Sequence, residues 1–80
     1  MQKDFDEQYD RFCRLLVKFR KKAGVSQEVV AEKLNRRQAY ISKCERGTRR
    51  MNFIEFIEMA EAVGYDPCTF IKEFRSRKKV

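Results

Sequence analysis

Apolar residues recur every three or four positions over most of the chain, which is the spacing of one face of an α-helix. Phe12, Leu16 and Phe19 follow this spacing, and charged residues fill many of the positions between them. Gly24 comes shortly after this run and can adopt the left-handed conformation that often closes a helix. The pattern therefore predicts a first helix over residues 10–23.

A second helix is predicted to begin after Ser26, whose hydroxyl can accept a hydrogen bond from a backbone N–H of the first turn. Val30, Ala31 and Leu34 have the spacing of its inner face. The small side chain of Ala31 would let the following helix cross closely. Asn35 tolerates positive φ and is expected to end the second helix.

The third predicted helix runs to residue 45 or 46, buries Ile41 and Cys44, and is ended by Gly47. Two short helices joined by a tight turn form a helix-turn-helix, in which the second helix has the shape to enter the DNA major groove. The outward face of the third helix is polar and basic, which favours this interpretation.

Two further helices complete an all-α, five-helix prediction. Asn52 and Glu55 have the spacing of a capping box, and Gly64 is placed to end the fourth helix. Asp66 followed by Pro67 is typical of the start of a fifth helix. The fourth helix is expected to turn Phe53, Phe56, Ile57, Ala60 and Val63 inward, and the fifth continues through Phe70, Ile71 and Phe74. The predicted domain spans residues 11–74, between an acidic lead-in (1–10) and a basic tail (75–80).

Charge is distributed unevenly along this 80-residue chain, whose net charge is +7. Residues 1–10 carry one Lys against four acids (−3), residues 11–50 thirteen basic residues against three acids (+10), and residues 51–80 five against five (0). The excess positive charge coincides with the helix-turn-helix, which favours a polyanionic partner. No apolar run approaches membrane-spanning length, so we expect a soluble, cytoplasmic, single-domain protein with no membrane partner.

The three cysteines are scattered, no pair forms a CxxC motif, and the chain has no histidine. A zinc site or a disulfide framework is therefore not expected, and Cys13, Cys44 and Cys68 are interpreted as small buried hydrophobic residues. Without histidine, and with no cysteine visibly paired to a base, the sequence does not favour an enzyme, a metal site or a cofactor.

Several short motifs, in order and at matching spacing, resemble the Cro/cI-type (XRE-type) helix-turn-helix family of phage repressors and small bacterial regulators. The resemblance covers about residues 16–71 and implies a five-helix, lambda-repressor-like DNA-binding fold. The size resembles that of restriction-modification controller proteins and Cro-like phage regulators. The matching segments are Phe19-Arg20, residues 24–27, Val30-Ala31, Leu34, residues 40–42, residues 45–47, residues 60–64 and Asp66.

The resemblance implies roles for individual residues. A partly buried ion pair between Arg20 and Glu45 would fix the third helix, in which the bases would be contacted by Gln38, Ala39 and Lys43. These side-chain types suit adenine, a thymine methyl group and guanine, respectively. Contacts to the DNA backbone, or of mixed type, are expected from Gln27, Arg37, Tyr40, Ser42, Arg46, Thr48, Arg49 and Arg50.

The chain departs from the family pattern before the third helix, where Arg36-Arg37 replaces the usual apolar residue followed by Ser or Thr. The expected helix cap is therefore missing, and Asn35 becomes a candidate cap one turn earlier. Either arrangement affects where the third helix starts and how it is tilted. Val29 also replaces a usually polar residue, so it is expected to be exposed or to touch a partner.

One DNA-contacting helix reads only a few base pairs, so we expect a homodimer on a two-fold symmetric double-stranded DNA site. The apolar residues Tyr65, Phe70, Ile71 and Phe74 are the candidate dimer interface. The main alternative is a module that binds a protein partner, such as an antitoxin, which need not exclude DNA binding. RNA binding would require more stacking aromatic residues on an open face than Tyr40 alone.

Overall fold

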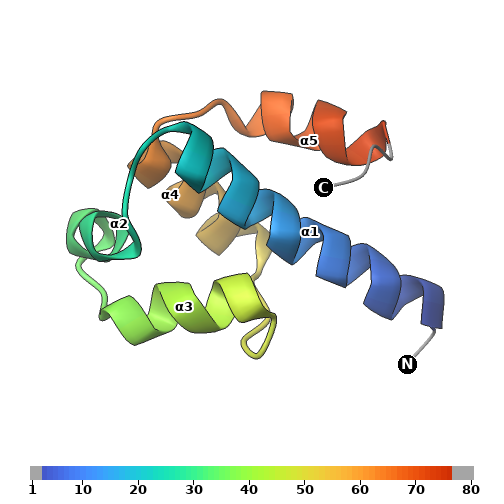
Figure 1. Ribbon diagram of the computed structural model, residues 1–80, viewed down its shortest axis with the longest axis horizontal. Helices are drawn as coiled ribbons and strands as arrows, with labels where there is room; N and C mark the ends of the chain where they lie inside the picture. Colours follow the sequence, from blue (N-terminus) through green and yellow to red (C-terminus); the bar gives the residue numbers. More distant parts are fainter. Residues whose placement is uncertain (1–2, 77–80) are drawn as a thin grey trace.

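The computed structural model describes residues 3–76, with side chains described from residue 6 onward, and these residues form five α-helices and no strand (Figure 1). The all-α, five-helix prediction is confirmed. Residues 1–2 and most of the predicted basic tail 75–80 lie outside the described residues. The helices are α1 (Lys3–Lys22), α2 (Gln27–Leu34), α3 (Gln38–Arg46), α4 (Phe53–Val63) and α5 (Pro67–Arg75).

Helix α1 is longer than the sequence pattern indicated, because it begins at Lys3 rather than near residue 10. The acidic residues Asp6 and Glu7 lie near its positively polarised N-terminal end, where carboxylates are favourable. Tyr9 packs its ring 5.4 Å from that of Phe12 and so extends the apolar face by one turn. The described part of the predicted acidic lead-in is therefore helical.

The predicted helix ends are confirmed where local side chains determine them. The Ser26 hydroxyl accepts the Val29 N–H, and Asn35 closes α2 with a φ of 54°. Asn52 and Glu55 form the complete capping box at the start of α4. At α5, a carboxylate oxygen of Asp66 accepts the N–H of Cys68, and Pro67 occupies the first turn.

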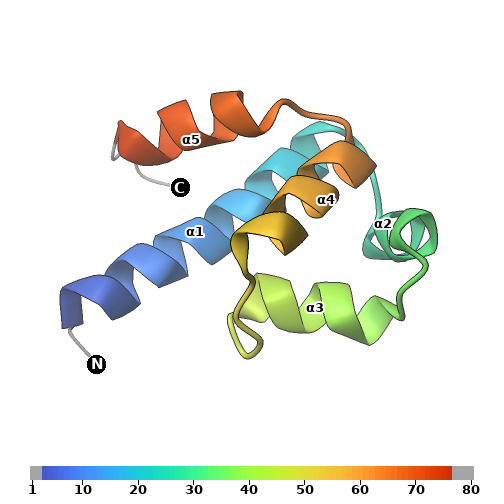
Figure 2. The same cartoon turned by 180° about the vertical axis from the view of Figure 1, so that it is seen from behind.

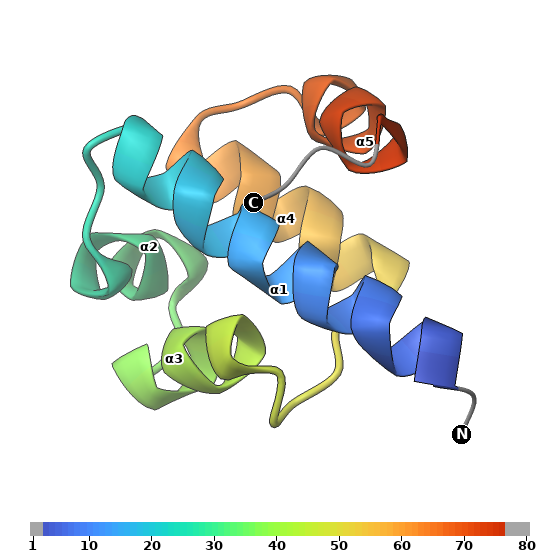
Figure 3. The ribbon, with the colours of Figure 1, turned by 45° about the vertical axis from the view of Figure 1, so that its right-hand side comes forward.

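The helices are arranged in layers, as Figures 1 and 2 show. Helices α1 and α4 run through the middle, α5 covers one side of them, and α2 and α3 lie on the opposite side. Figure 3 shows the same separation between α5 and α3 from another direction. The outward face of α3 is therefore free of the other four helices. The largest fully buried side chains are Phe70, Leu15, Ile41, Met59, Val30 and Cys44.

Three predicted environments are wrong. Phe53, expected on the inner face of α4, is 66% exposed because it lies at the first position of that helix, beyond the cover of its neighbours. Phe70, expected at a dimer interface, is only 2% exposed because its ring packs against Phe19 and Phe56. Cys68 is exposed, whereas Cys13 and Cys44 are buried thiols as expected.

Candidate nucleic-acid interface

The turn between α2 and α3 is closed by backbone hydrogen bonds. The N–H of Asn35 donates to the carbonyl of Glu32 (3.1 Å), and the N–H of Arg36 donates to that of Ala31 (2.9 Å). Arg37 is the N-cap of α3 and makes no side-chain capping bond. The missing cap was thus correctly expected, but Asn35 does not replace it, because its left-handed backbone ends α2 instead.

A nearly buried ion pair joins α1 to the C-terminal part of α3. The Arg20 guanidinium donates to both carboxylate oxygens of Glu45, from Nε at 2.6 Å and from Nη2 at 3.1 Å. Only 12% of the Arg20 side chain and 5% of the Glu45 side chain are exposed. A third bond runs from Nη1 of Arg20 to the carbonyl of Val25 (3.0 Å). This geometry fixes α3 against the core, as the family resemblance implied.

Two glutamine side chains extend this pair to the start of α3. Gln27 donates from Nε2 to Oε1 of Glu45 (2.9 Å), and Gln38 donates from Nε2 to Oε1 of Gln27 (3.3 Å). The side chain of Gln38 is therefore held in place by contacts that lead back to a buried charge. Pre-positioning of this kind lowers the conformational entropy that a side chain loses on binding.

The outward face of α3 is polar and available to a ligand. Buried Ile41 and Cys44 anchor the helix from behind. On the outer side, Arg46 donates a hydrogen bond from Nη1 to the hydroxyl of half-buried Ser42. The exposed residues of this helix face and its cap are Arg37, Gln38, Ala39, Lys43 and Arg46.

Two guanidinium groups lie against the ring of Tyr40, and one of them belongs to Arg49, an expected contact to the DNA backbone. Arg36 and Arg49 lie 4.4 and 4.8 Å from the centre of its ring. Arg49 also donates to Oε1 of Glu55 (3.1 Å), and this bond is the main reason that the pKa of Glu55 is lowered. Burial raises the pKa of Tyr40 to about 12, so its hydroxyl stays protonated at neutral pH.

The loop between α3 and α4 is tied to both helix α3 and the first turns of α1. The hydroxyl of Thr48 donates to the carbonyl of Lys43 (3.3 Å), which satisfies one of the last carbonyl groups of α3. Arg50 lies 4.1 Å from the ring centre of Tyr9 and 3.7 Å from a carboxylate oxygen of Asp6. Tyr9 and Asp6, neither of which is among the expected site residues, are thus neighbours of this loop. Tyr9 stands three residues before Phe12, so the helical spacing could have revealed it.

The comparisons with known proteins agree with this geometry. A family model described as a helix-turn-helix domain matches residues 10–70. The chain is also similar to the solved structure of an XRE-family like protein from Pseudomonas syringae pv. tomato str. DC3000, at 30% sequence identity and a TM-score of 0.85. The match covers 90% of this chain and 88% of that one. The chain belongs to the XRE-type helix-turn-helix family. No curated protein matches it.

Membership of the XRE-type family makes this chain a helix-turn-helix protein of the DNA-binding regulator type. The outward face of α3 is therefore the candidate DNA-contacting surface. None of the described helices is long and apolar enough to cross a lipid bilayer.

The residues expected at a dimer interface are only partly available in this XRE-type domain. Tyr65 stacks on Phe70, with ring centres 5.8 Å apart, and its buried hydroxyl has no hydrogen-bond partner among the described residues. Phe74 is half-buried beneath the guanidinium of Arg11, whereas Ile71 is 39% exposed. An apolar cavity of about 190 Å³ lies beside these residues, lined by Phe12, Phe53, Phe56, Phe70, Ile71 and Phe74.

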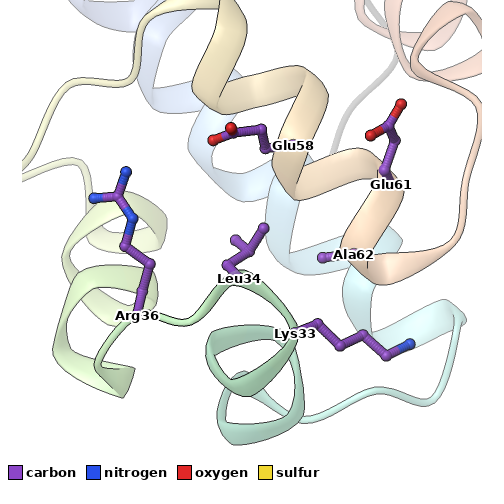
Figure 4. A pocket seen from close by; sticks show the side chains of 6 residues that line it. All are labelled: Lys33, Leu34, Arg36, Glu58, Glu61 and Ala62. Atoms are coloured by element: carbon purple, nitrogen blue, oxygen red, sulfur yellow. The ribbon is translucent and has the colours of Figure 1, made fainter.

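A larger cavity, of about 500 Å³, lies between α2 and α4 (Figure 4). Figure 4 shows its four charged side chains carried by the two helices and the turn after α2. Its lining combines two cations, two carboxylates and two apolar side chains, and holds no pairing of a nucleophile with a base. The lining residues are Lys33, Leu34, Arg36, Glu58, Glu61 and Ala62.

Proposed function

We propose that the protein is a sequence-specific transcriptional regulator that binds a two-fold symmetric DNA site as a homodimer, with α3 in the major groove. The observation that carries this proposal is the outward face of α3. This face is polar and exposed, and the ion pair between Arg20 and Glu45 fixes the helix behind it. It lies within the segment of residues 11–50, which carries a net charge of +10.

We assign base contacts to Gln38, Ala39 and Lys43, because all three are exposed on this face. Contacts to phosphate or of mixed type would come from Arg37 and Arg46 on α3, from the N-terminal turn of α2 near Gln27, and from the loop that follows α3. In that loop Arg50 is the main candidate. Arg49 is already paired with Glu55 and lies against the ring of Tyr40, so we assign Arg49 and Tyr40 to contacts of mixed type.

A selection of bound fragments from random DNA tests the proposal, and it should return a two-fold symmetric site. Gln38→Ala and Lys43→Ala should each relax the preference at particular base pairs, by about 1–3 kcal/mol. Arg50→Ala should weaken all sequences alike and reduce the salt dependence. Lys72→Ala is the matched control, because it removes the same charge from α5, on the side of the molecule away from α3. Binding without any sequence preference would refute the proposal.

For the homodimer, we revise the candidate surface to Phe53, Ile54, Ile71 and Phe74. The first two are 66% and 64% exposed, and the apolar cavity lies against Phe53, Ile71 and Phe74. A two-fold interface places the same patch on both subunits, so a protruding apolar side chain beside an apolar hollow can complement itself. A patch of this kind would supply the apolar centre of a standard interface, which needs about 800 Å² from each partner.

Sedimentation equilibrium of Ile71→Glu and Phe53→Glu tests this surface. Both side chains are exposed, so the variants should fold, remain monomeric and lose tight binding to the full symmetric site. Val29→Glu is the control, because Val29 is also exposed (41%) but lies on α2, outside the patch. If both patch variants dimerise like the unmodified chain, this face is not the dimer interface.

An antitoxin-like role is the second candidate, because the same exposed apolar patch would suit a different protein chain. The two candidates predict different stoichiometries. The purified chain alone should form dimers if the patch binds a second copy. A purified chain that stays monomeric, and that associates through Phe53 with a protein encoded beside its own gene, would favour the antitoxin-like role.

A further inference from the structure

One tyrosine hydroxyl holds the backbone on both sides of Arg50. The hydroxyl of Tyr9 accepts a hydrogen bond from the N–H of Met51 (3.1 Å) and donates to the carbonyl of Arg49 (3.5 Å). These two backbone groups flank Arg50, and they lie about forty residues from Tyr9 in the sequence. Tyr9 therefore fixes the path of the loop at the residue to which we assign a phosphate contact.

The side chain of Arg50 is also placed by the first turns of α1. Its guanidinium lies 4.1 Å from the centre of the Tyr9 ring, close enough for a cation–π contact. A carboxylate oxygen of Asp6 lies 3.7 Å from Nη2 of Arg50, and about half of each side chain is exposed. Such an exposed pair is weak and is readily exchanged for another anion.

Helix α1 also lies close to the residue that ends α3. Gly47 has a φ of +81°, and a Cβ at this position would lie 3.4 Å from Sγ of Cys13 and 3.9 Å from the Tyr9 ring. The chain therefore leaves α3 directly against α1. Burial raises the pKa of Tyr9, so its hydroxyl remains able to donate at neutral pH.

We propose that Tyr9 and Asp6 are positioning residues that set the strength of DNA-backbone binding from a site that does not itself touch the DNA. Tyr9 holds the loop so that Arg50 points toward the phosphates. Asp6 pairs with Arg50 in the free protein, and a DNA phosphate would displace it. The net gain in binding free energy from the contact between Arg50 and that phosphate is therefore reduced. This inference rests on the proposed function, since it assumes that Arg50 meets DNA.

Three variants of the full chain test the inference. Tyr9→Phe removes only the hydroxyl and keeps the ring beneath Arg50. Asp6→Asn removes the charge that faces Arg50. Glu7→Gln is the matched control, because Glu7 is the next residue in the same turn and has no ion pair within the described residues. Affinities are measured for the selected site and for a random duplex, each over a range of salt concentrations, together with the melting temperature of each variant.

The two variants should change the affinity in opposite directions. Asp6→Asn should bind both duplexes about two- to fivefold more tightly than Glu7→Gln does, the range that an exposed ion pair supports. Tyr9→Phe should bind both duplexes more weakly, and its slope of log affinity against log salt should become shallower by about 0.9, the value for one lost phosphate contact. Neither variant should alter the base preference. A purely structural role would not produce opposite shifts in affinity.

Other outcomes overturn the inference in distinguishable ways. If Asp6→Asn behaves like Glu7→Gln, Asp6 does not compete with phosphate. If Tyr9→Phe keeps both the affinity and the salt slope of the unmodified chain, Tyr9 does not position Arg50. If the unmodified chain binds no duplex at all, the proposed function fails and this inference fails with it.

Discussion

Removing one member of the ion pair between Arg20 and Glu45 should be among the most destabilising single changes in this domain. In Arg20→Met, the carboxylate of Glu45 would lose two of the three hydrogen bonds that reach it and would keep only the one from Gln27. Only 5% of this side chain is exposed, so water cannot replace the lost donors without a rearrangement. The variant therefore contains an uncompensated buried charge.

The expected cost is about 3–5 kcal/mol, the range for breaking a buried pair from one side. The free energy of unfolding of a small domain is about 5–15 kcal/mol in total. In a domain of this size each kcal/mol lowers the melting midpoint by about 4–8 °C. We therefore expect Arg20→Met to melt at least about 12 °C below the unmodified chain, as measured by circular dichroism.

The double variant Arg20→Met/Glu45→Leu separates the cost of the orphaned charge from the value of the pair. Replacing both members by apolar residues removes the buried charge, so most of the lost stability should return. In the double variant, however, Gln27 would lose its acceptor, so Gln38 should lose its fixed position and the base preference should relax. If Arg20→Met melts within about 3 °C of the unmodified chain, the reasoning is refuted, because the ion pair is then not buried in solution.

Three further predictions test other parts of the structure. The hydrogen bond from Arg49 lowers the pKa of Glu55, so ionised Glu55 stabilises the fold above about pH 4.5 and this stabilisation is lost as the pH falls through the lowered pKa. Thermal melts at pH 7 and pH 3 should therefore show that Glu55→Gln loses less stability on acidification than the unmodified chain does. Only Cys68 should react rapidly with a thiol reagent in the native state, because burial raises the pKa of Cys13 to about 11 and Cys44 is also buried; a second fast thiol would contradict the packing. Phe70→Ala should cost about 3–5 kcal/mol in urea unfolding, and a cost below about 1 kcal/mol would mean that the ring is not in the core.

The helix ends were predictable because they depend on side chains within a few residues of each other. Ser26, Asn52 and Asp66 each accept a backbone N–H two or three residues later, so their roles follow from local spacing alone. The all-α fold and the outward face of α3 followed from the same periodicity. The pairing of Arg20 with Glu45 came from the family resemblance, because no local rule joins residues 25 positions apart.

The depth of burial was less predictable, because helical periodicity gives the inner face of a helix but not how far its neighbours extend. Phe53 and Phe70 both lie on apolar stretches, yet the first is exposed at the start of α4 and the second is enclosed by rings from α1 and α4. The partners of Tyr9 were unpredictable for a related reason. Arg49 and Met51 are about forty residues from Tyr9 in the sequence, so local spacing does not reveal that they lie beside it.

Other contacts hold the start of α3 in place of the missing cap. A capped start is worth about 1 kcal/mol, and Arg37 provides no such bond. Instead, Arg36 lies against the ring of Tyr40, four residues later, and Gln38 bonds to Gln27 of α2, so one local and one tertiary contact hold the first turn of α3. Two cations beside the positive end of the helix dipole are unfavourable in the free protein. The same charges favour the binding of an anion at that position. The departure from the family pattern thus weakens the isolated helix and places two positive charges at its N-terminal end.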